Sequence, residues 1–531
     1  MGKTSGKGWK KIVRLTVLAA ALAMTLTACG GGKTTDTTQR AEKETERSGV
    51  EDMLAAMKGE ETTDAMAGDN QAVIEIGTAE ELAEFRDRVN AGEQALDAVL
   101  TADIDMSSVC GETAGSWVPI ASEDGHMGGS YNGVFDGAGH VIRGLYMAGD
   151  DVDYAGLFLK IGYTGIVKDL GLEEVYIDSF NAAALTLENE GIIENCYSSG
   201  TVKGYDVSGL IGQTLKESKV TNCYSMTAVE GRNGASGVVR ESYSAEISGC
   251  YNQGSVSVVD GKSSSYAAGV VGSASGTVTD CYNAGAISGG NDGGGVAGGL
   301  REGAVMRNCY NTGSVTDIFR AAGVCGGVDE SAMLRCYNEG TVEGKVLAAG
   351  VAIVSGETSQ KSVVANCFNR GEVSSSSYAM GVAVATNSLL LNCYNQGTVA
   401  SENQNMSGAS GVGGGAVKGG DEAQMMYNCY GAGPLTEGSG GLLYWDDTEL
   451  DSVFYQDDTA LGYFFNRKSD DQDPTHGVSK AQLTDGTVLG QLNAYVDGFL
   501  GLPEDCVTVE GLTLDPWKAG ADGYPVFEWE N

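Results

Sequence analysis

Nine cysteines at nearly regular intervals are the residues of this sequence whose types and spacing most suggest chemistry. They follow one another at 26 to 36 residues, and an aromatic residue comes directly after each of them. Thiols in such a series could form disulfides, bind a metal ion or act as redox groups. The series consists of Cys196, Cys223, Cys250, Cys281, Cys309, Cys336, Cys367, Cys393 and Cys429.

The surroundings of these cysteines argue against each of those roles. In a repeating fold equivalent positions stack, so the Cβ vectors of neighbouring cysteines lie side by side and do not face one another as a disulfide requires. Zinc sites need CxxC pairs or nearby histidines, and neither occurs. We expect no metal and no cofactor, and a structural ladder of free, buried thiols. The alternative is that Cys faces outward and the neighbouring aromatic residue faces inward.

Other catalytic groups are sparse or lack a recognisable frame. The three histidines, His126, His140 and His476, include no HExxH sequence, so a metallopeptidase would lack its central feature. No GxSxG elbow and no P-loop occur. We therefore predict no catalytic residues.

Carboxylates are numerous enough to supply the pair that a glycosidase needs. Two or three Asp in a loop are usually solvated, and no twelve-residue calcium loop frames any of them. The candidates for acid/base catalysis or calcium binding are Asp103, Asp105, Asp136, the cluster of Asp150, Asp151 and Asp153, and the cluster of Asp470, Asp471 and Asp473.

The cysteines belong to a repeat, and this repeat must position them. Phrases such as NCYNTGSV at Asn308 recur nine times from Asn195 to Leu435, and Gly-Val pieces such as AGVVG at Ala268 lie between them. The apolar runs are short and broken by Gly, Asn or Ser, which excludes helical repeats. The leucine-rich frame is missing, and a propeller blade needs a longer unit. What is left is a parallel β-solenoid.

Three ladders of apolar residues indicate the fold class, an all-β, right-handed parallel β-helix with three strands per coil and small helical caps at both ends. The ladders are the position three before each Cys, the residues after the Gly-Val pieces, and the position six after Cys. A corner turn at the Asn before Cys would let both Ile193 and Cys196 point inward. We expect the repeated Asn residues to hydrogen-bond their own turn or the Asn stacked above.

The repeat phrases resemble those of GLUG-motif proteins, a group of secreted or surface bacterial proteins. The likeness covers roughly residues 98 to 530, although Thr227 replaces the usual Gly of the second unit and Val often stands where the family has Leu. The resemblance implies a β-helical surface protein. It implies little about chemistry, because the repeat is a structural unit.

The start of the chain predicts export. Residues 1–28 combine five basic residues with an apolar run from Leu15, as a signal peptide does. Leu26-Thr27-Ala28-Cys29 resembles a bacterial lipoprotein box, which implies lipidation of Cys29. Residues 29–72 are polar and predict a disordered tether. We expect the protein to be anchored by its N-terminal lipid to the outer face of the bacterial membrane, at the cell surface; a soluble secreted protein is the alternative.

Three further regions are predicted to fold. Residues 73–190 form an N-terminal helix cap and atypical first coils, 191–438 the repeats, and 439–531 a C-terminal capping region. Capping boxes at Thr78 and Ser479 each begin a helix. We expect strands at Leu512 to Trp517 and Tyr524 to Trp529.

Charge narrows the possible partners. The net charge of −38 makes nucleic acid an improbable partner. We expect adhesion, or binding of a glycan or a host or matrix protein, on the long flanks and without catalysis. The alternative is a polysaccharide lyase or glycoside hydrolase on a β-helix, which carboxylates clustered with a Lys or Arg in one groove would favour. A passive spacer is a third possibility.

Overall fold

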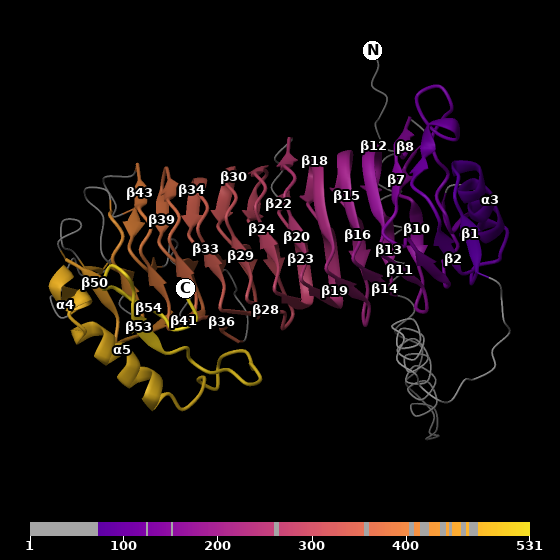
Figure 1. The fold of residues 1–531 in the computed structure, drawn as a ribbon. Helices are drawn as coiled ribbons and strands as arrows, with labels where there is room; N and C mark the ends of the chain where they lie inside the picture. Colours follow the sequence, from indigo (N-terminus) through magenta and orange to yellow (C-terminus); the bar gives the residue numbers. More distant parts are fainter. Residues whose placement is uncertain are drawn as a thin grey trace, which may run out of the picture. The chain divides into compact units, whose positions relative to one another are not determined.

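The chain folds into parallel strands stacked in a β-solenoid of about 13 turns, as the computed structural model of the protein shows (Figure 1). The predicted parallel β-helix with helices at both ends is thus confirmed. The predicted signal peptide, Cys29, the tether, Asp150-Asp151 and the cluster at Asp470 lie outside the described residues. The structure describes residues 73–123, 126–149, 152–259, 265–354, 360–402, 408–414, 424–435, 442–444, 449–457, 464–466 and 476–530.

One coil illustrates how the sequence makes a turn. Strand β14 (Ile192–Glu194) ends at Asn195, which adopts φ 53°, a left-handed conformation that Asn tolerates better than most residues. This corner turns the chain so that Ile193 and Cys196 are both fully buried, as predicted. The coil continues through β15 (Tyr197–Ser208), β16 (Ile211–Thr214) and β17 (Lys219–Thr221) to the next corner.

This coil has the three strands predicted, whereas later coils divide the same path more finely. There β15 is replaced by pieces such as β24 (Tyr282–Asn283), β25 (Ile287–Gly289) and β26 (Asp292–Gly294). The buried Asn283 explains the break, because its amide bonds both the N–H (3.2 Å) and the C=O (2.9 Å) of Gly285 and so replaces the strand ladder with a local turn. In β15 the equivalent residue is Ser198.

Two further columns run along the stack beside the cysteines. In six successive coils the residue two after Cys is a fully buried asparagine, and from Asn252 to Asn369 each Nδ2 donates to the Oδ1 of the next at 2.8 Å, for example from Asn283 to Asn311. The aromatic residues after Cys stack face to face, with ring centroids 4.8 Å apart between Tyr197 and Tyr224. Identical side chains therefore support one another from coil to coil.

The N-terminal end of the stack is covered by helix α3 (Ala79–Asn90), which lies beside strand β1 (Ile74–Ile76). The predicted capping box at Thr78 is present, since its side chain accepts from the Glu81 N–H at 3.2 Å. Phe85 packs on Phe135, with ring centroids 5.7 Å apart. The helix thus closes the apolar end of the first coils.

The C-terminal region runs back along the stack. It contains α4 (Lys480–Thr484), α5 (Thr487–Gly498) and the antiparallel strands β53 (Trp517–Ala519) and β54 (Pro525–Phe527). The capping box at Ser479 is present. The segment predicted as a strand from Leu512 pairs only from Trp517, because the residues before it bond side chains of the repeats, as when the Thr513 carbonyl accepts from Asn366 at 2.9 Å.

None of the helices in the described ranges is long and apolar enough to cross a bilayer.

Candidate functional site

The nine cysteines of the repeat are buried and line one inner column. The Cys223 Sγ lies 3.5 Å from the backbone nitrogen of Cys196, and the Cys196 thiol donates to the carbonyl of Glu194 at 3.3 Å. Burial raises the pKa of Cys223 and Cys281 well above the usual range. All cysteines in the described parts of the chain are free thiols, and those of the repeat are fully buried, out of reach of soluble reactants.

Three of the carboxylates singled out from the sequence, Asp103, Asp105 and Asp136, hold local structure. Asp103 accepts from Arg143 at 3.1 Å, and its pKa is lowered by hydrogen bonds from His140, the backbone and Arg143. Asp105 accepts from the Ser107 N–H at 2.9 Å and caps the 3-10 helix Met106–Ser108. Asp136 pairs with a lysine side chain at 2.7 Å.

Of the candidate residues, Asp103 and His140 are brought together, with the His140 Nδ1 3.2 Å from the Asp103 Oδ1. His476 contacts the carbonyl of Val453 at 2.7 Å, far along the chain from His140. In the ranges that the structure describes, no group of three or more His, Cys, Asp or Glu side chains could hold a metal ion.

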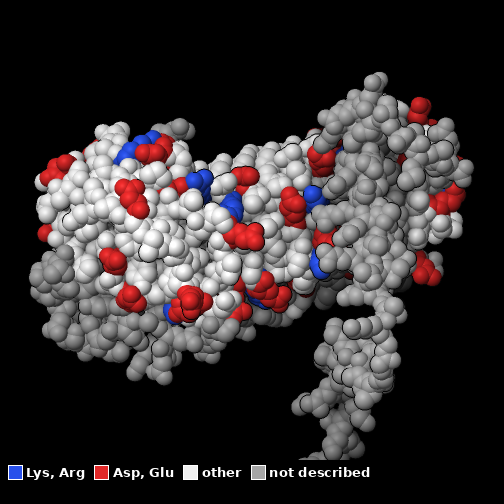
Figure 2. Space-filling model, turned by 90° about the horizontal axis from the view of Figure 1, so that it is seen from below, with Lys and Arg blue, Asp and Glu red and all other residues white. Residues whose placement is uncertain are grey.

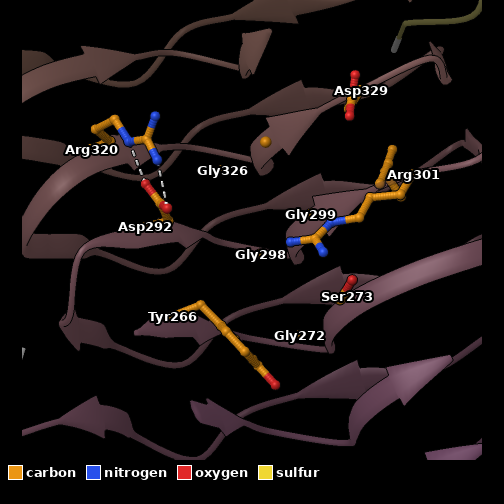
Figure 3. A pocket seen from close by; sticks show the side chains of 12 residues that line it. Tyr266, Gly272, Ser273, Asp292, Gly298, Gly299, Arg301, Arg320, Gly326 and Asp329 are labelled. Atoms are coloured by element: carbon orange, nitrogen blue, oxygen red, sulfur yellow. Dashed lines mark hydrogen bonds and ion pairs between the residues drawn. The ribbon is translucent and has the colours of Figure 1, made fainter. Parts of the chain in front are cut away.

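A hollow of about 290 Å³ on one flank of the stack was not predicted from the sequence. Its floor is made by three neighbouring strands, β23 (Val271–Thr279), β27 (Ala297–Leu300) and β31 (Cys325–Val328), which pair in parallel. We call this feature the glycine-floored hollow; Figure 3 shows it from close by. Its lining residues are Tyr266, Gly272, Ser273, Asp292, Gly298, Gly299, Leu300, Arg301, Arg320, Gly326, Gly327 and Asp329.

The floor forms because three successive coils lack large side chains at two equivalent positions. The coil before them carries Arg240 and Glu241 there, which form an ion pair at 2.5 Å. In the next three coils these positions are Gly272-Ser273, Gly298-Gly299 and Gly326-Gly327. In the coil after them Ile353 is 2% exposed and packs in an apolar cluster, which ends the hollow.

The glycines of the floor differ in how closely their neighbours approach. A Cβ on Gly298 would lie 2.4 Å from the carbonyl oxygen of Gly272, so this glycine is required by the backbone of the adjacent coil. A Cβ on Gly299 would lie no closer than 3.7 Å to any other atom, and the same holds at Gly327. The last two positions therefore open into the hollow.

Two columns of larger residues form the walls (Figure 3). Tyr266, Asp292 and Arg320 occupy one register position in successive coils, on β22 (Tyr266–Ala268), β26 and β30 (Val315–Ala322). Arg301 and Asp329 line the opposite side, next to Ser273 of the floor. The stacking of the coils fixes both columns, since the backbone N–H of Arg301 donates to the Ala274 carbonyl at 2.9 Å.

The charges of the hollow are only partly compensated. Arg320 holds Asp292 with two hydrogen bonds of 2.5 and 2.7 Å. Arg301 is exposed and makes no ion pair with any residue that the structure describes. The Asp329 Oδ1 is buried and has no hydrogen-bond partner among those residues.

The hollow is better suited to binding than to proton transfer. Burial raises the pKa of Tyr266, so its hydroxyl stays protonated at neutral pH. Neither histidine nor lysine is among the described lining residues. The face in Figure 2 carries acidic and basic side chains next to one another and no continuous basic band, which disfavours nucleic acid there.

The sequence does contain a signal for the hollow. The Gly-Val pieces GVAGG (Gly295 to Gly299) and GVCGG (Gly323 to Gly327) end in a double glycine, whereas GVVR (Gly237 to Arg240) ends in a large residue. Doubled glycines at the same place in successive repeats indicate a part of the flank that has no side chains to cover it.

Comparison with known proteins assigns no family. No family model matches the chain. A "Putative Gly-rich membrane protein" of Evansella cellulosilytica is 34% identical over 100 residues, which are 18% of this chain and 11% of that protein. Halomucin of Haloquadratum walsbyi is 31% identical over 122 residues, 22% of this chain and 1% of that protein. The chain thus spans about a tenth or less of these relatives.

Two solved structures have a weak likeness to the fold. One from Bacteroides ovatus, described as a "putative immunoglobulin A1 protease", aligns over 87% of this chain and 94% of its own with 18% identity and a TM-score of 0.29. The other, described as "IgA1 Protease", aligns over 58% of this chain and 22% of its own with 14% identity and a TM-score of 0.33. At these scores the matches assign neither a family nor an activity.

Proposed function

We propose that the protein is a bacterial lipoprotein with GLUG-like repeats that binds a ligand at the cell surface and has no catalytic role. The basic residues, the apolar run and Leu26-Thr27-Ala28-Cys29 support export and lipidation of Cys29. A long solenoid presents extended flanks to partners such as a glycan or a host or matrix protein.

The glycine-floored hollow is the single observation that carries the binding proposal. Three coils lack the side chains that cover equivalent positions in neighbouring coils, and polar residues wall the space that results. A concave site with a few placed polar groups is the usual form of a small-ligand site. Its volume of about 290 Å³ suits a small ligand or one unit of a longer chain.

A binding array tests this proposal with a variant in which a larger side chain fills the hollow. The full-length protein and its variant Gly299→Leu are applied to glycans and matrix proteins. The variant should fold normally, because the new side chain projects into open space. Thr341→Leu, at an exposed position just before a strand of another part of the stack, is the matched control. We expect a ligand that the wild type and Thr341→Leu bind and that Gly299→Leu does not. Binding unaffected by Gly299→Leu would place the site elsewhere, and uniform inactivity would favour a passive spacer.

Lipidation has its own test. In cells fed a labelled fatty acid, the wild-type chain should carry label and sediment with membranes. Cys29→Ser should lose both properties, whereas Cys110→Ser, at a buried cysteine of the folded region, should keep them. Equal labelling of the two variants would contradict the anchor.

A second candidate function follows from the same hollow. Asp292 and Asp329 share it with Arg301 and Arg320, and carboxylates grouped with arginines are what a polysaccharide lyase or glycoside hydrolase on a β-helix would use. The ion pair between Arg320 and Asp292 and the raised pKa of Tyr266 speak against a free base. A depolymerisation assay decides: release of sugar ends that Asp329→Asn abolishes would make the protein an enzyme.

A further inference from the structure

We infer that the ligand of the glycine-floored hollow is a sugar that carries a carboxylate. The inference rests on the proposed binding function and adds the chemical class of the ligand. It is drawn from the charges, the hydrogen-bonding groups and the size of the hollow.

The carboxylate is indicated by the two arginines, of which one has an acidic partner and the other has none among the described residues. Arg320 already donates from its Nε and one Nη to the two carboxylate oxygens of Asp292. Arg301 lies across the floor, where its Nε is 3.8 Å from the position that a Cβ on Gly299 would take. It has no acidic partner among the described residues, and a guanidinium of this kind pairs best with a planar carboxylate through two parallel hydrogen bonds.

The sugar is indicated by the remaining wall residues. The Asp329 Oδ1 is a buried acceptor without a donor in the described part of the chain, and it suits a ligand hydroxyl. Ser273 adds a hydroxyl group, and the Tyr266 ring supplies an amphipathic surface. Apolar side chains contribute little, since Leu300 is buried in the core. A ligand with a carboxylate at one end and hydroxyl groups around a compact ring meets these features together.

Competing small ligands fit less well. An apolar molecule would leave Arg301 and Asp329 desolvated and unpaired. A simple cation would gain Asp329 but would meet the positive charge of Arg301, and the other described lining carboxylate, Asp292, is already paired with Arg320. A neutral sugar would satisfy the hydroxyl partners and leave the guanidinium to water.

The experiment compares acidic sugars with their methyl esters on the full-length protein. Oligomers of galacturonate, glucuronate, mannuronate and guluronate, together with sialyllactose, are titrated by calorimetry, each beside its methyl ester. The variants are Arg301→Gln, Gly299→Leu and the charge-matched control Lys216→Gln, whose lysine is exposed in a turn away from the hollow. Circular dichroism confirms that each variant is folded.

We expect at least one acidic sugar to bind about tenfold or more tightly than its ester. Arg301→Gln should remove that preference, Gly299→Leu should remove binding, and Lys216→Gln should change neither. If every acid binds no better than its ester while Gly299→Leu still weakens binding, the carboxylate inference is overturned and the binding site stands. If neither acid nor ester binds, or if Gly299→Leu has no effect, both the inference and the proposed site are overturned.

Discussion

Replacing one buried asparagine of the repeat should destabilise the protein more than replacing an asparagine at a corner. The Asn311 side chain makes four hydrogen bonds. It donates to the Gly313 carbonyl and to Asn338, both at 2.8 Å, and it accepts from the Gly313 N–H at 3.2 Å and from Asn283 at 2.8 Å. Because it is fully buried, water cannot replace the lost partners.

The magnitude follows from these four bonds. At a net contribution of about 1 kcal/mol for each bond, Asn311→Ala should lower the free energy of unfolding by about 4 kcal/mol. Each neighbouring asparagine keeps a bond to its own turn, so the loss does not spread along the column. The control is Asn308→Gly, at an exposed corner with φ 54°, where one side-chain bond of 2.9 Å is lost and glycine accepts the backbone. We expect a loss of about 1 kcal/mol there.

Urea denaturation at equilibrium measures both values. Far-ultraviolet circular dichroism and tyrosine fluorescence should give coincident transitions, so that the shift in midpoint reports stability. A loss for Asn311→Ala no greater than that for Asn308→Gly would refute the view that the buried amide column holds the coils together.

Three further predictions follow from the packing. Gly298→Ala should lower the free energy of unfolding by about 2 kcal/mol in urea denaturation, because its Cβ would meet the backbone of the preceding coil, whereas Gly299→Ala should cost nothing measurable. Equal effects would contradict the described floor. Burial raises the pKa of Cys325 to about 12, so above a pH of about 9 only the unfolded chain ionises this thiol. The free energy of unfolding should therefore fall as the pH rises, and it should fall less steeply in Cys325→Ala. An unchanged slope in the variant would contradict the raised pKa. Asp515→Ala removes the buried partner of Arg335 (2.8 Å) and should speed limited proteolysis of the C-terminal segment; unchanged cleavage would mean that this ion pair does not hold it.

Local sequence patterns predicted the fold because each repeat contains the residues that form its own strands and corners. The corner at Asn195 and the inward Cys196 follow from an Asn placed between two apolar positions. The capping box at Thr78 needs only four residues. The break in the strand at Asn283 could be predicted only by knowing that the Asn283 amide hydrogen-bonds its own turn. The equivalent residue Ser198, which lies within an unbroken strand, gives no sign of this.

Features that depend on alignment between distant residues could not be predicted. The glycine-floored hollow exists only because Gly298 and Gly326 reach the same register in successive coils, and coil lengths vary from 26 to 36 residues. The contact between Arg335 and Asp515 joins residues 180 positions apart. Their sequence surroundings give no sign that the C-terminal segment returns along the stack.

A crystal structure of the full-length protein with the acidic sugar that binds best would test the central claim most directly. The predicted result is a sugar seated on Gly299 between Tyr266 and Arg301, with its carboxylate against the guanidinium. A sugar bound on another face of the stack, or coils in which Gly272 and Gly298 are not neighbours, would contradict it.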